Sequence, residues 1–172
     1  MMIIACLGNP GKKYSRNRHN AGFILGGLAA GHYGISVRSE KYSSLTGSGT
    51  IANVETMFLF PQTYMNNSGA AVRAALQFKK EKPDNLIVLH DEIELAFGEV
   101  RAKFGGGHKG NNGVRSIMAE LGTGDFHRIR VGVGRPADPD LAVADYLLSN
   151  FTAGEIEQLE ALLPTVTSLM EK

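Results

Sequence analysis

Apolar residues along the chain fall into two kinds of pattern, short strand-like runs and longer stretches with helical spacing. Strands are expected over six segments: residues 3–7, 45–51, 57–60, 86–89, 99–104 and 129–133. The continuous run at 86–89 is typical of a strand covered on both faces, whereas the alternation at 129–133 predicts a half-exposed strand. Glycines around the second and third segments indicate a hairpin or meander.

Apolar residues at helical spacing lie between and after these strands. Helices are expected over four stretches: residues 21–28, 68–77, 114–121 and 153–166. Gly31 and Gly34 are expected to end the first and Gly122 the third. Candidate N-caps of the second are the adjacent residues Asn66, Asn67 and Ser68. The last begins with a Thr152-x-x-Glu155 capping box, and Pro164 is expected to kink or shorten it.

Together these patterns predict one α/β domain over residues 1–172, with a mixed, largely parallel sheet flanked by helices. The apolar stretches are too short to span a bilayer and the chain enters a strand at once, so we expect neither a membrane partner nor a signal peptide. The single cysteine, Cys6, excludes an internal disulfide and fits a reducing compartment. We therefore expect a cytoplasmic protein with a buried, inert thiol.

The net charge of +1 conceals an uneven distribution of charged residues. Residues 101–135 contain seven Lys or Arg and two acids, whereas residues 139–172 contain six acids and one lysine. Four further cations, without an acid, occupy residues 12–18 directly after a tight polar turn. A basic middle segment indicates a polyanionic partner on one face, although charge alone favours the simpler interpretation of a solvated surface.

Four polar clusters adjoin the expected strands and helices. They are Asn9 with His19, residues 61–67, His90-Asp91-Glu92 and the glycine-rich residues 105–113. Loops that follow parallel strands converge on one edge of a sheet, so we expect these clusters to meet there.

His19 is the natural candidate for a general base, because histidine alone titrates near neutrality without help. Asp91 is the candidate partner, since a carboxylate bound to one ring nitrogen fixes the tautomer and stabilises the imidazolium. Taken singly, His19 is better explained by helix capping or packing, and Asp91 by a turn. No Gly-x-Ser-x-Gly motif is present, so a pair without a nucleophile indicates activated water. The residues from His90 to Glu94 lack the spacing of a known metal motif, and no metal is expected.

Neutral amides and aromatic rings lie close to these groups in the sequence. Asn9, Asn66 and Asn112 each donate and accept hydrogen bonds, which suits a carbonyl, a water or an oxyanion, although turns and N-caps also favour asparagine. Tyr14 and Tyr64 suit stacking on a base, and ordinary packing is the alternative.

The glycines at 105–107 allow a ligand to approach the backbone closely, although they form neither a P-loop nor a Gly-x-Gly-x-x-Gly motif. Lys103 and Arg130 are near them in the sequence and favour phosphates over bases.

In order and spacing, these clusters resemble the bacterial-type peptidyl-tRNA hydrolases. The resemblance covers nearly the whole chain. The matching stretches are Leu7-Gly8-Asn9-Pro10-Gly11 with Tyr14, Arg18-His19-Asn20-Ala21-Gly22, Pro61-Gln62-Thr63-Tyr64-Met65-Asn66 with Ser68-Gly69, His90-Asp91-Glu92, Lys103 through Gly105-Gly106-Gly107-His108-Lys109-Gly110 to Asn112-Gly113, and Phe126 to Gly134.

The resemblance implies a monomeric, metal-independent esterase without a cofactor, acting on peptidyl-tRNA. It implies that His19 activates water, that Asp91 stabilises the basic form of His19, and that Asn9 distinguishes blocked from free aminoacyl groups. It also implies substrate contacts, from Tyr14, Tyr64, Met65, Asn66 and Asn112 at the peptidyl-adenosine end and from Lys103 and Arg130 at the tRNA phosphates.

Three departures from the family pattern stand out. Asn111 occupies a position where many members have histidine; an amide cannot ionise near neutrality but keeps a donor and an acceptor. Acids at 137–140 replace a lysine that helps to bind tRNA in many members, so we expect that phosphate contact to be missing. Many members also continue beyond the position of Lys172.

Two other functions fit parts of this pattern. One is a non-catalytic RNA-binding protein on the same fold, and the other is an enzyme for a small phosphorylated metabolite. The pairing of His19 with Asp91 favours catalysis, and the basic segments favour a large polyanion.

Overall fold

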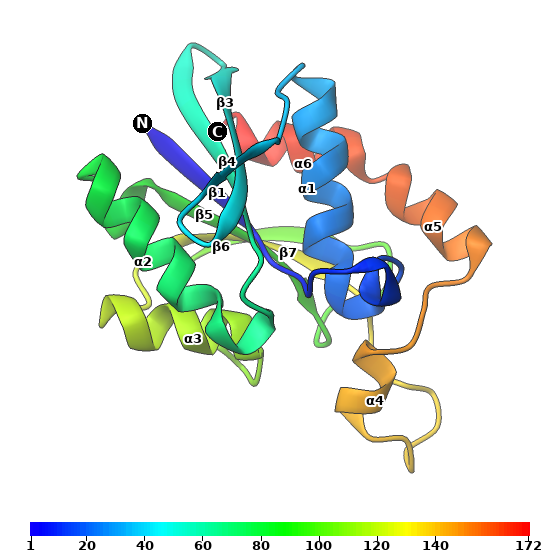
Figure 1. Ribbon diagram of the computed structural model, residues 1–172. Coiled ribbons are helices and arrows are strands. Elements are labelled where there is room, and N and C mark those ends of the chain that lie inside the picture. Colours follow the sequence, from blue (N-terminus) through cyan, green and yellow to red (C-terminus); the bar gives the residue numbers. More distant parts are fainter.

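Seven strands form one mixed sheet in a computed structural model that describes residues 1–172 (Figure 1). The strands are β1 (Met2–Cys6), β2 (Ser39–Lys41), β3 (Ser44–Ile51), β4 (Val54–Pro61), β5 (Leu86–Glu92), β6 (Val100–Phe104) and β7 (His127–Gly132). Their order is β2-β3-β4-β1-β5-β7-β6. The central four, β4-β1-β5-β7, are parallel, whereas β2, β3 and β6 pair antiparallel at the edges. The predicted α/β class with a mixed, largely parallel sheet is confirmed.

Helices cover both faces of this sheet. They are α1 (Ala21–His32), α2 (Ser68–Lys79), α3 (Asn112–Leu121), α4 (Val143–Leu147), α5 (Ala153–Glu160) and α6 (Leu163–Met170). One face packs against α2 and α3, and the other packs against α1, α5 and α6 (Figure 1). Cys6 is fully buried in the second of these layers, and burial raises the pKa of its thiol, as expected of an inert side chain. None of the helices combines the length and apolar character needed to cross a membrane.

Three details differ from the expectations. β7 is mostly buried rather than half exposed, because it lies between β5 and β6 and Arg128 turns inward. The short elements β2 and α4 were not predicted, since three and five residues carry too little periodicity. The last predicted helix is two helices: the Thr152–Glu155 capping box begins α5, and Pro164 lies in the first turn of α6.

Gly22 brings the start of α1 into contact with the end of β1 and the middle of β5. A Cβ atom at this position would lie 2.4 Å from the Leu89 carbonyl oxygen and 2.7 Å from that of Leu7. Those backbone atoms cannot yield as a flexible side chain would, so only glycine permits the approach. The close contact carries the turn before α1, with its histidine, against the end of β5.

Candidate active site

A cavity of about 310 Å³ lies at the carboxyl ends of the parallel strands β1, β4 and β5, where open α/β sheets bind ligands. It contains most of the residues predicted for the site and three that were not. Its walls are Asn9, Tyr14, His19, Tyr64, Met65, Asn66, Asn112, Ala144, Leu147 and Leu148. Three of the polar clusters therefore meet at this edge of the sheet, as the strand–loop pattern predicts: Asn9 with His19, residues 61–67 and residues 105–113. Asp91, from the His90-Asp91-Glu92 cluster, lies directly behind the cavity wall.

His19 and Asp91 form a buried pair. The His19 Nδ1 atom lies 2.7 Å from Asp91 Oδ2, and the Asp91 side chain is only 1% exposed. Burial by itself lowers the pKa of His19, but the negative charge of Asp91 and the hydrogen bond to it raise that pKa by more, so it lies above its ordinary value. Nδ1 donates to the carboxylate, and Nε2 is left as the ring nitrogen available to a ligand in the cavity.

The turn that carries His19 is held in place by its neighbour Asn20. The Asn20 Oδ1 atom accepts a hydrogen bond from the Asn9 backbone N–H at 2.9 Å, and its Nδ2 donates to the Asn9 carbonyl at 2.9 Å. One buried amide thus binds the 3₁₀ turn Arg18–Asn20 to the loop after β1. The loop and the turn cannot shift independently, which fixes Asn9 relative to His19.

The side chain of Asn9 has a defined orientation. Its Oδ1 accepts a hydrogen bond from the Met65 backbone N–H at 2.7 Å. Because that contact needs an acceptor, the NH₂ group of Asn9 is the part left free to donate. The cavity therefore presents an uncharged donor at this wall.

Tyr64 occupies a strained backbone conformation beside the cavity. Its φ of 63° and ψ of 158° fall where side chains other than glycine are rarely found. This conformation turns the chain at the end of β4 so that Met65 N–H meets Asn9. Tyr64 is an exposed residue, and its ring meets that of Tyr14 edge to face with centroids 6.3 Å apart. The two rings form an aromatic wall open to solvent.

Sequence reasoning missed the wall formed by α4. Ala144, Leu147 and Leu148 line the cavity from a segment that is otherwise acidic and exposed. A single helical turn with two leucines gives no distinctive pattern, and nothing in the sequence indicates that it reaches the loops after β1 and β4. Asn111, considered only as a departure from the family, also contacts the pair, donating from Nδ2 to Asp91 Oδ1 at 3.0 Å.

Lys103 and Arg130 do not line the cavity. They lie on the neighbouring strands β6 and β7 at the edge of the sheet. Burial of the ammonium group and the positive charges of Lys109, Arg130 and Arg128 lower the pKa of Lys103. Cations this close to one another favour an anion among them.

Arg128 connects the basic cluster, which consists of Lys103, Lys109, Arg128 and Arg130, to the glycine-rich loop. Its guanidinium donates to the carbonyl oxygens of Gly107 at 2.6 Å, Gly106 at 2.7 Å and Gly124 at 3.0 Å. Gly105 and Gly106 have φ values of 73° and 94°, which only glycine adopts easily. The loop is therefore shaped by a buried arginine rather than left free.

Arg18, one of the four cations at residues 12–18, is engaged inside the protein. It pairs with Glu155 at 3.0 Å, donates to the Asn150 carbonyl at 2.7 Å and stacks over Tyr146. This arginine fastens the turn before α1 to the start of α5, so its charge is not available to a phosphate.

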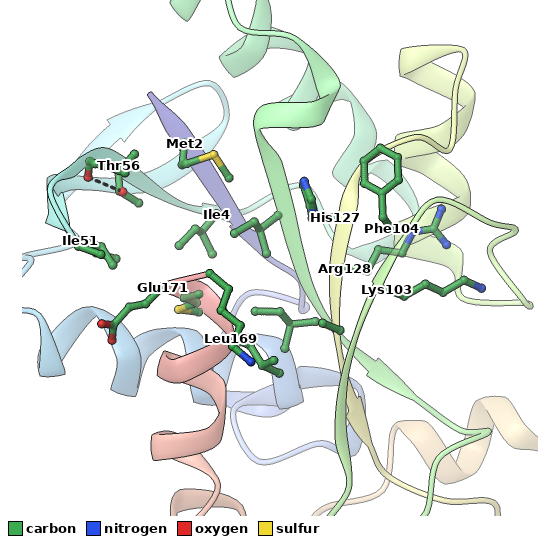
Figure 2. Close-up of a pocket in the computed structure, with 17 residues that line it drawn as sticks. Met2, Ile4, Ile51, Thr56, Lys103, Phe104, His127, Arg128, Leu169 and Glu171 are labelled. Atoms are coloured by element: carbon green, nitrogen blue, oxygen red, sulfur yellow. Dashed lines mark hydrogen bonds between the residues drawn. The ribbon is translucent and has the colours of Figure 1, made fainter.

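A second, larger hollow of about 560 Å³ lies at the opposite, amino ends of the parallel strands (Figure 2). Its walls are mainly apolar and come from the strand ends and the C-terminal residues 169–172. Lys103 is the only predicted site residue among them, and its side chain points away from Ile4 and Leu169 (Figure 2). Size alone would favour this hollow, but it contains neither a base and carboxylate pair nor the convergent amides of the smaller cavity.

The His90-Asp91-Glu92 cluster is divided between different surroundings. His90 is fully buried, and burial lowers its pKa. Asp91 faces His19. No three His, Cys, Asp or Glu side chains come together in an arrangement that could hold a metal ion.

Known proteins resemble this chain in sequence and in fold. A family model described as peptidyl-tRNA hydrolase matches residues 3–172. The chain is 43% identical over 171 residues to the peptidyl-tRNA hydrolase of Syntrophotalea carbinolica (99% of this chain, 89% of the relative) and 47% identical over 168 residues to that of Geobacter metallireducens (98% and 86%). The crystal structure of the peptidyl-tRNA hydrolase from Acinetobacter baumannii matches with a TM-score of 0.90 at 34% identity, over 98% of this chain and 85% of that one. This chain therefore belongs to the peptidyl-tRNA hydrolase family.

Proposed function

We propose that this chain hydrolyses the ester between a peptide, or an N-blocked aminoacyl group, and the terminal ribose of tRNA, with water activated by His19 and without a metal ion. The observation that carries the proposal is the buried 2.7 Å contact between His19 Nδ1 and Asp91 Oδ2 at the wall of a cavity. The family membership supports the substrate class.

In this mechanism, His19 Nε2 takes a proton from a water molecule whose oxygen attacks the ester carbonyl carbon. Asp91 stabilises the imidazolium that forms, because its carboxylate holds the Nδ1 proton. The tetrahedral intermediate then expels the ribose oxygen as the C–O bond breaks. The imidazolium returns its proton to that oxygen, giving a free carboxylic acid and a tRNA with a free hydroxyl.

Asn9 supplies the choice between blocked and free aminoacyl groups. Its free NH₂ donates to the carbonyl oxygen of the blocking amide. A free α-ammonium at the same place would face the Asn9 NH₂ group, and two hydrogen-bond donors cannot bond to each other. No Asp or Glu lines the cavity to receive the positive charge. An uncharged donor in a cavity without an acid therefore disfavours unblocked aminoacyl-tRNA.

The remaining residues divide between the two ends of the substrate. The aromatic wall of Tyr14 and Tyr64 suits the terminal adenine, and Met65, Asn66 and Asn112 complete that part of the cavity. Lys103 and Arg130 lie outside it and suit the phosphates of a tRNA whose terminal adenosine enters the cavity.

The test is hydrolysis of N-acetyl-aminoacyl-tRNA by the purified protein in excess EDTA. We expect release of the acetyl-amino acid, little action on unblocked aminoacyl-tRNA, and a loss of kcat of about 100-fold or more in His19→Ala. The matched control is His32→Ala, because His32 is exposed on the far end of α1 and lies outside the cavity.

Three outcomes would contradict parts of the proposal. Tight tRNA binding without hydrolysis would favour the non-catalytic RNA-binding protein. Activity that EDTA abolishes and added metal restores would refute the metal-independent mechanism. Full activity in His19→Ala would remove the proposed base.

A further inference from the structure

Asp91 receives hydrogen bonds on both carboxylate oxygens, from two different parts of the chain. Oδ2 faces His19, and Oδ1 accepts from the Asn111 side chain at 3.0 Å. The carboxylate is almost fully buried, so these contacts replace the water that would otherwise stabilise its charge. Asn111 is thus the one side chain other than His19 that bonds to this anion.

The orientation of the Asn111 amide is fixed from its other end. Asn111 is the N-cap of α3, and its Oδ1 accepts from the Val114 backbone N–H at 3.0 Å. Its Nδ2 donates to Asp91 Oδ1 and also to the Asp91 carbonyl at 3.1 Å. Rotating the amide by 180° would place an oxygen against two oxygens and a nitrogen against a backbone N–H. The helix cap therefore commits the NH₂ group to Asp91.

We infer that Asn111 is a positioning residue for catalysis: it holds the Asp91 carboxylate directed at His19 through a donor that has no ionisation of its own. This inference rests on the proposed function. The carboxylate stabilises the His19 imidazolium only while its Oδ2 faces Nδ1, and the hydrogen bond from Asn111 to Oδ1 holds it in that orientation. Because an amide donates at every pH, Asn111 does not itself titrate. The fall in kcat on the acid side of the pH profile (the acid limb) is therefore expected to report the protonation of His19 alone.

Two substitutions separate this role from helix capping. Serine and aspartate cap helices about as well as asparagine. Asn111→Ser keeps the cap acceptor, but its side chain is too short to reach Asp91. Asn111→Asp keeps the size and the cap but places a second carboxylate oxygen against Asp91 Oδ1, and its added negative charge raises the pKa of His19. Asn53→Asp is the matched control, because Asn53 is in an exposed turn between β3 and β4.

The experiment measures kcat and KM for N-acetyl-aminoacyl-tRNA hydrolysis from pH 5 to pH 9. We expect Asn111→Ser to lower kcat by about 10- to 100-fold, the effect of losing a hydrogen bond to a charged group, with KM unchanged. We expect Asn111→Asp to lower kcat at neutral pH and to shift the acid limb to higher pH, while Asn53→Asp does neither.

The outcomes distinguish this inference from the proposed function. If the unaltered protein does not hydrolyse the substrate, the proposed function fails. If it does, and both Asn111 variants keep its kcat and its pH profile, Asn111 is only a helix cap and the inference is wrong. An effect confined to KM would overturn it in the same way. Should Asn111→Ser unfold, Asn111→Asp still decides the question, since it keeps both volume and cap.

Discussion

Asp91→Asn tests how the buried pair works, because it changes one carboxylate oxygen into an NH₂ group at nearly constant volume. In the unaltered protein, both oxygens accept hydrogen bonds, from His19 and from Asn111. The new amide has only one acceptor. If it serves Asn111, its NH₂ faces His19 Nδ1, which must then accept, so the ring proton moves to Nε2 and blocks the base.

The size of the effect follows from these contacts. Losing one hydrogen bond to a charged group costs about 1.5–3 kcal/mol, which corresponds to a fall in kcat of roughly 10- to 150-fold. The wrong tautomer adds to that loss. The acid limb should also move to lower pH, because the two causes that raise the pKa of His19 disappear while burial, which lowers it, remains.

Initial rates of N-acetyl-aminoacyl-tRNA hydrolysis between pH 5 and pH 9 measure both quantities, with thermal unfolding as the check on folding. A kcat of Asp91→Asn within about threefold of the unaltered protein, or an acid limb that stays in place, would refute the role assigned to the pair. A fall in kcat caused by unfolding would be recognised from the melting curve.

Two further predictions concern the fold and the tRNA contact. Gly22→Ala should lower the free energy of unfolding by about 1–3 kcal/mol, because its Cβ would meet the Leu89 carbonyl at 2.4 Å; an unchanged urea midpoint would show that α1 can move away. Lys103→Ala should raise KM for peptidyl-tRNA but not for a short peptidyl-adenosine mimic, and it should reduce the salt dependence of tRNA binding by about one counterion. Equal effects on both substrates would place Lys103 at the ester rather than at a phosphate.

Much of the sheet was predictable because its strands differ clearly in pattern. The run at 86–89 has no polar residue to place on a surface, and it forms the first part of β5, between β1 and β7 inside the sheet. The alternation at 129–133 predicted exposure wrongly, because Arg130 and two glycines look like a solvent face. Gly132 is instead small so that the Ala96 carbonyl can approach, as a Cβ there would lie 2.2 Å from that oxygen. The sequence alone does not distinguish a glycine required for close packing from a glycine exposed on a surface.

The pair of His19 and Asp91 was predictable for a related reason. His19 lies beyond the loop that follows β1, and Asp91 lies near the end of β5. Parallel strands bring the segments at their carboxyl ends to one edge of the sheet. Arg18, next to His19, shows where this reasoning stops. Its neighbours in sequence are basic, but its partner Glu155 is 137 residues away, and only the packing of α5 against the turn reveals that its charge is already paired.

The asparagines show most clearly what structure adds, because one residue type performs three different tasks. Asn20 uses both ends of its amide on the backbone of Asn9 and so braces a loop. Asn9 uses only its oxygen, on Met65, which leaves a donor for the substrate. Asn111 uses its oxygen on the cap of α3 and its nitrogen on Asp91. What each can do depends on which amide atom its neighbours leave unpaired, and backbone groups from distant parts of the chain decide that. The test of this reasoning is that Asn20→Asp, Asn9→Asp and Asn111→Asp should fail differently: the first in stability, the second in discrimination against unblocked aminoacyl-tRNA, and the third in the pH dependence of kcat.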